Sequence, residues 1–433
     1  MHLGARLQAA IEVLSEIDAH HRPAGDALRD WGRTHRFAGS GDRAVIGNLV
    51  FDALRKRRSL AARLGSDMPR LVILGVAVHL WELSVDHVAD ACRLQHGPGE
   101  LSDDERSALG NGPAAQAAPS ALGDYPEWLE PAFARVFGDA AVSQAEALAE
   151  RAPVDLRVNT LKASRDKVEK ALARFGAAPT AISSVGLRIE PPRADKRSPH
   201  VESETAHGRG WFEVQDQGSQ IAALMTCAKP GMQVIDLCAG AGGKSLALAA
   251  AMNNKGQIYA YDADRTRLRK SFERLKRAGA RNIQVLDAGD RSKLADLEER
   301  ADVVLIDAPC TGSGTWRRRP DAKWRLSEQA LRRRIEEQRS VLALAAPLVK
   351  SGGRLVYVTC SVLPEENGDQ IEAFLHANPD YRSVPYREVW AEGVGGEPPA
   401  SADGSDTSLL LTPRDHGTDG FFIAVMERVH GLD

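Results

Sequence analysis

Two of the five cysteines follow apolar, strand-like runs, where their thiols could act together. Cys310 lies in residues 307–314, which read DAPCTGSG, and Cys360 belongs to the segment Thr359-Cys360-Ser361 that follows the apolar, strand-like run from Leu355 to Val358. Because the carboxyl ends of parallel strands meet at one edge of a sheet, we expect both thiols and Asp307 at that edge. A thiolate that adds to carbon 6 of a cytosine lets carbon 5 accept a methyl group, while an acid supports ring nitrogen 3. The pair suits attack on a pyrimidine ring, whereas a lone cysteine is usually inert.

A glycine-rich turn between a strand-like run and a helical run is the second chemical feature. Residues 236–245 read DLCAGAGGKS, and such glycines let a ligand approach the backbone and the free N–H groups of the following helix. A dinucleotide fingerprint fails at Ser245, and a phosphate-binding P-loop needs glycine where Cys238 stands. A nucleoside-type methyl donor needs an acid after the second strand, which Asp262 supplies. The cation of Lys244 is expected to lower the pKa of a nearby thiol.

Basic and aromatic residues alternate shortly after the Cys310 motif. Arginine interleaved with tryptophan suits phosphate contacts and base stacking on single-stranded nucleic acid. Charge runs are more often solvated helix faces, and that interpretation stays open for residues 332–334 and 55–58. The residues predicted to contact RNA are Arg317, Arg318, Arg319, Lys323, Trp324 and Arg325.

Composition limits the class of protein. The chain has 433 residues, of which 43% are hydrophobic and 27% charged, with a net charge of -3, and this length is typical of about three globular domains. The apolar run at residues 71–81 is shorter than the roughly 20 residues that a membrane span needs. The N-terminal residues do not resemble a secretory signal, so we expect a cytoplasmic protein without a membrane partner. The cysteines include no C-x-x-C pair, so we expect neither a disulfide framework nor a metal site.

Hydrophobic patterning predicts the elements that must position these residues. Residues 1–125 have helical periodicity and end in a linker rich in glycine, proline and alanine, and residues 126–215 predict a small helical and α+β subdomain. In residues 216–433, strand-like runs alternate with helical ones, which predicts a Rossmann-like, doubly wound α/β sheet covered by helices on both faces. The runs at residues 408–411 and 421–425 predict an antiparallel pair at the sheet edge.

Taken together, the motifs resemble those of the RsmB/Sun-type RNA cytosine-5 methyltransferases. The resemblance covers about residues 150–430, and residues 42–80 look like the NusB-like, RNA-binding helical domain of RsmB-type members. The segments that carry the resemblance are DAPCTGSG (307–314), RRPDAKW (318–324), TCSVLPEEN (359–367), FEVQDQGS (212–219) and DGFF (419–422).

The resemblance implies roles for individual residues. Cys360 would be the nucleophile that bonds to cytosine, and Cys310 would assist proton removal and release of the enzyme. Asp307 would contact the cytosine ring, and Lys244 would support that site. The residues implied to hold S-adenosylmethionine are Cys238, Ala239, Gly240, Ala241, Gly242, Gly243, Lys244, Asp262, Asp287 and Asp307.

The donor turn departs from the family pattern at two positions. The family's turn usually reads C-A-A-P-G-G-K, whereas Gly240 and Ala241 stand here in place of alanine and proline. Loss of the proline loosens the turn without removing its N–H donors, so we expect an effect on donor affinity.

The predicted activity is transfer of a methyl group from S-adenosylmethionine to carbon 5 of a cytosine in RNA, through a covalent intermediate with Cys360. The expected substrate is small-subunit ribosomal RNA, and the expected state is a monomer. A DNA cytosine-5 enzyme would need a Glu-Asn-Val tripeptide, which does not occur in the sequence. Alternatives that stay open are a transfer RNA methyltransferase, a non-catalytic RNA-binding assembly factor and a P-loop-type nucleotide hydrolase.

Overall fold

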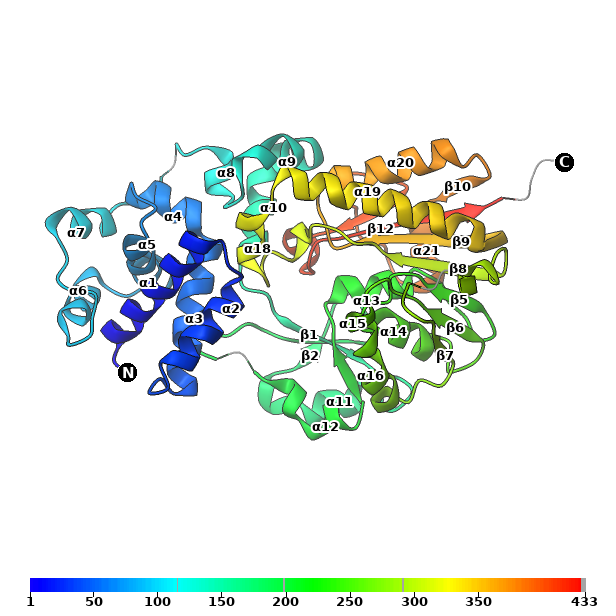
Figure 1. Ribbon diagram of the computed structural model, residues 1–433, viewed down its shortest axis with the longest axis horizontal. Helices are drawn as coiled ribbons and strands as arrows, with labels where there is room; N and C mark the ends of the chain where they lie inside the picture. The colour runs from blue at the N-terminus through cyan, green and yellow to red at the C-terminus, as the bar shows by residue number, and fades with distance from the viewer. Residues whose placement is uncertain (115, 198, 290–291, 430–433) are drawn as a thin grey trace. The chain divides into compact units, whose positions relative to one another are not determined.

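The computed structural model describes residues 1–114, 116–197, 199–289 and 292–429 (Figure 1). Among these residues the chain forms two compact units. Unit 1 comprises Met1–Arg151, Pro191–Pro199 and Trp316–Leu326, and unit 2 comprises Ala152–Glu190, His200–Thr315 and Ser327–Asp433. Within the described residues, no helix is long and apolar enough to cross a membrane.

Unit 1 is helical, as the periodicity of its apolar residues predicts. Leu7 and Leu14 of the first helix are buried in one core with Ile46 and Leu49 of the third. The helices are α1 (Leu3–His20), α2 (Ala24–Thr34), α3 (Ser40–Arg55), α4 (Arg57–Leu64), α5 (Pro69–Gly75), η1 (Val76–Leu80), α6 (Val85–Arg93), α7 (Asp103–Leu109), α8 (Pro119–Leu122), η2 (Glu127–Leu129), α9 (Glu130–Phe137), η3 (Gly138–Ala140), α10 (Ala141–Leu148) and α18 (Pro320–Arg325).

The structure divides the chain differently from the predicted boundaries. Residues 126–151 belong to unit 1, where the rings of Tyr125 and Phe133 stack with centroids 4.4 Å apart. The segment Trp316–Leu326, predicted as part of the catalytic domain, also belongs to unit 1, and Trp316 stacks on Phe133 at 6.1 Å. Aromatic packing between segments far apart in the sequence therefore sets the limits of unit 1.

Unit 2 begins with a four-stranded antiparallel sheet in the order β2-β3-β1-β4. Leu156, Leu187 and Phe212 are buried in its core, so the predicted small α+β subdomain is confirmed. Its elements are β1 (Val154–Val158), α11 (Arg165–Ala171), η4 (Ala173–Phe175), β2 (Ala178–Pro179), β3 (Gly186–Ile189), η5 (Val201–Ser203), α12 (Thr205–Gly208) and β4 (Phe212–Val214).

The larger sheet of unit 2 has eight strands, with β10-β12-β9-β8-β5-β6-β7 in order and β11 paired to β12. Its five strands from β9 to β7 are parallel, and the last three strands of the chain are antiparallel. The predicted antiparallel pair is confirmed, but β12 lies between β9 and β10 instead of at the edge. The strands are β5 (Gln233–Asp236), β6 (Gln257–Ala260), β7 (Ile283–Val285), β8 (Ala301–Asp307), β9 (Val349–Thr359), β10 (Tyr381–Val384), β11 (Ser408–Leu411) and β12 (Phe421–Arg428).

Helices cover both faces of this sheet, as predicted for a doubly wound fold (Figure 1). Leu305 and Val358 belong to one core with Leu248 and Trp390, which come from helices on one face. The helices of unit 2 that follow β4 are α13 (Gln217–Leu224), α14 (Gly243–Ala251), α15 (Arg265–Arg269), α16 (Ser271–Ala278), α17 (Ser292–Ala295), η6 (Ser313–Thr315), α19 (Glu328–Ala345), η7 (Ala346–Leu348), η8 (Pro364–Glu366), α20 (Gly368–Ala377), α21 (Tyr386–Gly393) and α22 (Pro413–His416).

Candidate active site

The carboxyl ends of parallel strands bring the two predicted thiols of unit 2 together. Asp307 at the end of β8 is the register partner of Val358 in β9, so the loops that follow these strands start at one level of the sheet. The Sγ atoms of Cys310 and Cys360 lie 3.4 Å apart. The structure thus places both thiols side by side, at the edge where the strand pattern predicts them.

Two cysteines near these strand ends, Cys310 and Cys238, have a raised pKa. The hydrogen bond with Cys360, followed by burial, raises the pKa of Cys310 well above its usual range. Burial also raises the pKa of Cys238, because a thiolate removed from water is disfavoured. The expectation that Lys244 lowers the pKa of a nearby thiol is therefore wrong for these two cysteines.

Lys244 and Asp307 form an ion pair at the same strand ends. Lys244 Nζ lies 2.7 Å from Asp307 Oδ2 and 5.4 Å from the centroid of the Phe421 ring. Lys244 is only 6% exposed, whereas the Asp307 side chain is 37% exposed. The Asp307 carboxylate can therefore contact a ligand, while the buried Lys244 holds that carboxylate in place from the protein side. A lysine already paired in this way does not favour the P-loop interpretation.

The turn after β5 has a backbone shape that glycine adopts most readily. Gly240 and Gly242 have φ of +54° and +79°, in the left-handed region. Asp262, which follows β6, accepts a hydrogen bond from the Gly240 N–H at 2.7 Å and another from the Asp264 N–H at 2.7 Å. The acid is thus fixed beside the turn and the N-terminus of α14. This arrangement fits the ribose and the charged end of S-adenosylmethionine.

Two arginines that sequence analysis missed support this turn. Arg274 Nη1 donates to the Ala241 carbonyl at 2.9 Å, and its Nη2 donates to Glu213 at 3.0 Å. Arg157 donates to the Gly243 carbonyl at 3.4 Å, and burial lowers the pKa of Arg157 to about 10. These contacts restrain the turn that lacks a proline. Glu213 lies in the FEVQDQGS motif, and this motif was the sequence feature that could have indicated residues holding the turn.

Two further acids near the donor turn, Asp236 and Asp287, differ in how deeply they are buried. Asp236 is fully buried at the end of β5, accepts from Ser245 Oγ at 2.6 Å, and burial raises its pKa to about 7. Asp287 follows β7, and its side chain is 83% exposed, 3.8 Å from Lys293 Nζ. Asp236 therefore holds the start of α14 through Ser245. Asp287 lies on an exposed loop, and its contact with S-adenosylmethionine stays a prediction.

The stretch predicted to contact RNA belongs to unit 1, and two of its residues are buried there. Arg317 is 5% exposed and Lys323 is 1% exposed. Lys323 Nζ donates to the Arg55 carbonyl at 2.8 Å, and Arg55 Nη2 donates to the Arg317 carbonyl at 3.0 Å. The burial of both side chains does not favour contact with RNA, and their role in RNA binding stays a prediction. The residues with at least partly exposed side chains, which stay predictions, are Arg318, Arg319, Trp324 and Arg325.

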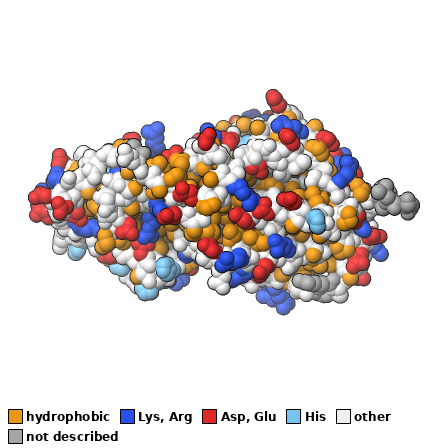
Figure 2. Space-filling model, turned by 90° about the horizontal axis from the view of Figure 1, so that it is seen from above, with side chains coloured by type: hydrophobic (Ala, Val, Ile, Leu, Met, Phe, Trp, Pro, Cys, Tyr) orange, Lys and Arg blue, Asp and Glu red, His pale blue; other side chains and the backbone are white. Residues whose placement is uncertain are grey.

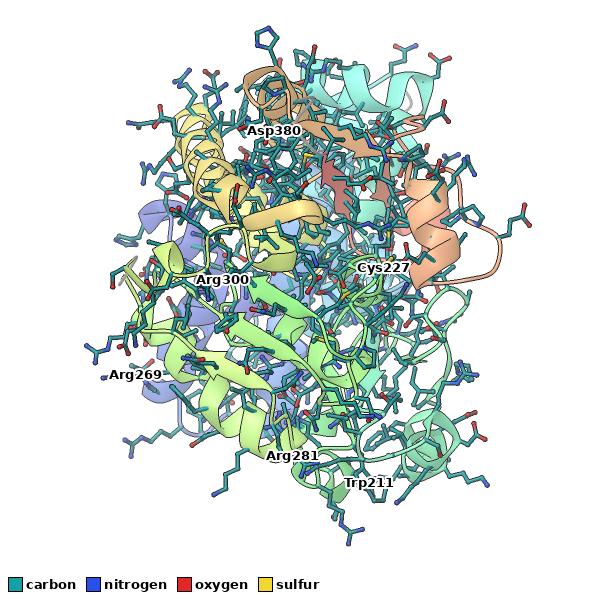
Figure 3. The ribbon with its side chains drawn as sticks, turned by 90° about the vertical axis from the view of Figure 1, so that its right-hand side faces the viewer. Trp211, Cys227, Arg269, Arg281, Arg300 and Asp380 are labelled. Atoms are coloured by element: carbon teal, nitrogen blue, oxygen red, sulfur yellow. The ribbon has the colours of Figure 1, made fainter. Side chains whose placement is uncertain are left out.

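A basic helix pair in unit 2, α15 and α16, was also missed by sequence analysis. Helix α15 begins just after Asp262, so its cations flank the carboxyl end of β6. Arg269 lies at the periphery of the view in Figure 3. The charge run RTRLRK at residues 265–270 was the signal. The exposed basic residues that form no ion pair with a described residue are Arg265, Arg267, Arg269, Lys270, Lys276 and Arg281.

Comparisons with known proteins identify the family and agree with this fold. A family model described as "16S rRNA methyltransferase RsmB/F" matches residues 223–427, and one for the "Methyltr_RsmF/B-like, ferredoxin-like domain" matches residues 125–194. The chain is 35% identical over 311 residues to the probable ribosomal RNA small subunit methyltransferase B of Synechocystis sp., covering 70% of this chain and 67% of that protein. It is 31% identical over 391 residues to ribosomal RNA small subunit methyltransferase B of Sodalis glossinidius, covering 84% and 88%.

A solved structure extends the likeness to three dimensions. A methyltransferase homolog protein from Pyrococcus horikoshii is 28% identical, with a TM-score of 0.59, covering 72% of this chain and 98% of that one. The doubly wound sheet, its glycine-rich turn and the acid after the second strand define an S-adenosylmethionine-dependent methyltransferase. The chain belongs to the RsmB/F family of ribosomal RNA methyltransferases.

Proposed function

We propose that this protein transfers a methyl group from S-adenosylmethionine to carbon 5 of a cytosine in RNA, and that its substrate is small-subunit ribosomal RNA. The 3.4 Å contact between the sulfurs of Cys310 and Cys360 carries this proposal. Two thiols beside an exposed acid have no use in binding a phosphate or a dinucleotide. Methylation of cytosine at carbon 5 needs a nucleophile and a base on the same ring, and the pair supplies both.

Cys360 acts as the nucleophile. Its thiolate forms a bond to carbon 6, and the electron pair that moves to carbon 5 takes up the methyl group, which S-adenosylmethionine supplies when bound. Asp307 contacts the ring near nitrogen 3, where negative charge develops. Lys244 Nζ lies 2.7 Å from Asp307 Oδ2. A proton passes from Lys244 through Asp307 to nitrogen 3 as that charge develops, and it returns when the double bond reforms.

Cys310 takes part in the second half of the reaction. Its thiolate accepts the proton from carbon 5, the double bond between carbons 5 and 6 reforms, and the bond from carbon 6 to Cys360 breaks. Cys310 Sγ lies 3.4 Å from Cys360 Sγ, so the group that accepts the carbon 5 proton lies beside the sulfur that leaves carbon 6, which supports this role.

The RNA must present the target cytosine unpaired, because carbon 6 of a stacked base is out of reach of a side chain. Basic and acidic side chains are interspersed on the face that Figure 2 shows, and the net charge is -3. Local clusters of basic residues therefore matter more for RNA binding than the net charge does. The cations of α15 that form no ion pair with a described residue support contact with the RNA backbone. The names of the relatives, ribosomal RNA small subunit methyltransferase B, favour ribosomal over transfer RNA.

The test is transfer of labelled methyl to unmodified small-subunit ribosomal RNA and to transfer RNA, with wild type, Cys360→Ala and Cys310→Ala side by side. We expect label as 5-methylcytosine in ribosomal RNA only and its loss in Cys360→Ala. Cys310→Ala should accumulate a covalent protein–RNA adduct, because release is blocked. Full transfer by Cys360→Ala would contradict the assigned nucleophile, and label in transfer RNA alone would contradict the substrate.

A further inference from the structure

Glu366 and Asn367 are adjacent buried residues in the loop that follows Cys360. Glu366 is 0% exposed and Asn367 is 3% exposed. They stand at the junction of η8 and α20, where Asn367 has φ of -116° and ψ of -103°. Neither side chain can touch a substrate, yet both are polar and make several hydrogen bonds, so each is held there by specific partners.

Glu366 fastens the loop that carries Cys310. One carboxylate oxygen accepts the Thr311 N–H at 2.8 Å, and the other accepts the Thr311 hydroxyl at 2.5 Å. Gln338 of α19 donates to Glu366 at 3.1 Å and to the Pro309 carbonyl at 2.9 Å. The residues on both sides of Cys310 are therefore held by one connected group of side chains.

Asn367 fastens the loop that carries Cys360 in the same way. Its Oδ1 accepts the Thr359 hydroxyl at 2.6 Å, and its Nδ2 donates to the Ser361 carbonyl at 2.9 Å. Thr359 and Ser361 are the neighbours of Cys360 on either side. Two consecutive residues thus hold the flanks of both cysteines.

The donors around Glu366 match its ionised form. A carboxylate only accepts, and the described groups that hydrogen-bond to Glu366 can all donate: the hydroxyls of Ser361 and Thr311, the N–H of Thr311 and the amide of Gln338. Burial raises the pKa of Glu366, and these hydrogen bonds oppose that effect. An isosteric amide would replace the charge-assisted hydrogen bond from the Thr311 hydroxyl by a neutral one in which that hydroxyl accepts, and would so weaken the connection.

We propose that Glu366 and Asn367 are positioning residues that hold the two cysteine loops together, so that both thiols reach one cytosine. Their effect on catalysis rests on the function proposed above, whereas their effect on the distance between the sulfurs does not. The two effects are therefore measured separately.

The distance between the thiols is tested on the full chain with phenylarsine oxide. Its arsenic forms bonds to two thiols, the two thiol protons leave with the arsenic-bound oxygen as water, and a stable adduct requires both sulfurs to reach one arsenic. Wild type should retain the arsenical in excess 2-mercaptoethanol and release it to dithiothreitol, and Cys310→Ala and Cys360→Ala should not retain it. We expect Glu366→Gln and Asn367→Asp to weaken retention about tenfold, as expected for a lost buried hydrogen bond.

Matched variants separate positioning from unfolding. Glu372→Gln makes the same chemical change on the exposed face of α20 and should retain the arsenical like wild type. Thr311→Val removes only the hydroxyl that Glu366 accepts and should follow Glu366→Gln, while Thr311→Ser should restore retention. Thermal unfolding and donor affinity measured on each variant identify any protein that has lost its fold.

Methyl transfer gives the catalytic readout. In Glu366→Gln, kcat should fall about 10- to 100-fold, because small misplacements of reacting groups cost that much, while KM for RNA and Kd for S-adenosylmethionine stay within about twofold. Wild-type retention and kcat in folded Glu366→Gln and Asn367→Asp would overturn the proposal. If wild type methylates no RNA but arsenical retention still depends on Glu366, the proposed function fails and the positioning role stands.

Discussion

At the residue scale, single side chains decide how firmly the donor turn is held. Arg274 joins the Ala241 carbonyl to Glu213, and Arg277 also binds Glu213 at 2.6 Å, so the acid keeps a partner without Arg274. Arg274→Met should raise the Kd for S-adenosylmethionine about tenfold, since a hydrogen bond to a charged group contributes about 1.5–3 kcal/mol and water recovers part of it. Calorimetric titration checks this value, with the exposed Lys276→Met as control. An unchanged Kd would mean that the turn keeps its shape without Arg274.

At the scale of the element, α15 and the Lys270 that follows it place cations at the carboxyl end of β6 that find no acidic partner in the described chain. The double variant Arg269→Glu with Lys270→Glu should raise KM for RNA several-fold, leave kcat close to wild type and reduce the salt dependence of binding, because phosphate contacts release counterions. Filter binding over a range of salt concentrations, with steady-state kinetics, measures these effects. Arg300→Glu is the control, since Arg300 is exposed just before β8, at the opposite end of the strands. An equal rise in KM for the control would contradict a specific role for α15.

At the scale of the whole molecule, unit 1 contains a segment, Trp316–Leu326, that comes from the middle of the sequence of unit 2. Burial lowers the pKa of Lys323 in this segment from 10.5 to about 7. Between these pH values the unfolded chain binds a proton that the native chain does not, so the free energy of unfolding should rise with pH across this window. Lys323→Met should flatten that rise, as measured by urea unfolding at about pH 7 and about pH 9.5. Parallel pH dependence in both proteins would contradict a buried, uncharged Lys323.

Much of the candidate site could be predicted because its signals are local in the sequence. The strand-like runs and the turns after them identify the donor turn and the loops of Cys310 and Cys360, and their common edge follows from the geometry of parallel sheets. The thiol pKa could not be predicted in this way. Its direction depends on burial and on the second sulfur 3.4 Å away, and neither is a property of neighbouring residues.

The sequence by itself determined the alternation of strands and helices along the chain. It also identified the glycine turn with Asp262 and the two cysteines, because apolar periodicity and glycine conformation act over a few residues. Only the tertiary structure decided that Lys323 is buried in unit 1 and that Glu366 holds the Cys310 loop. Both results depend on hydrogen bonds between segments far apart in the chain: Lys323 donates to the Arg55 carbonyl, and Glu366 accepts from the Thr311 N–H. Burial and hydrogen-bond partners of this kind are set by packing, which a local pattern does not contain.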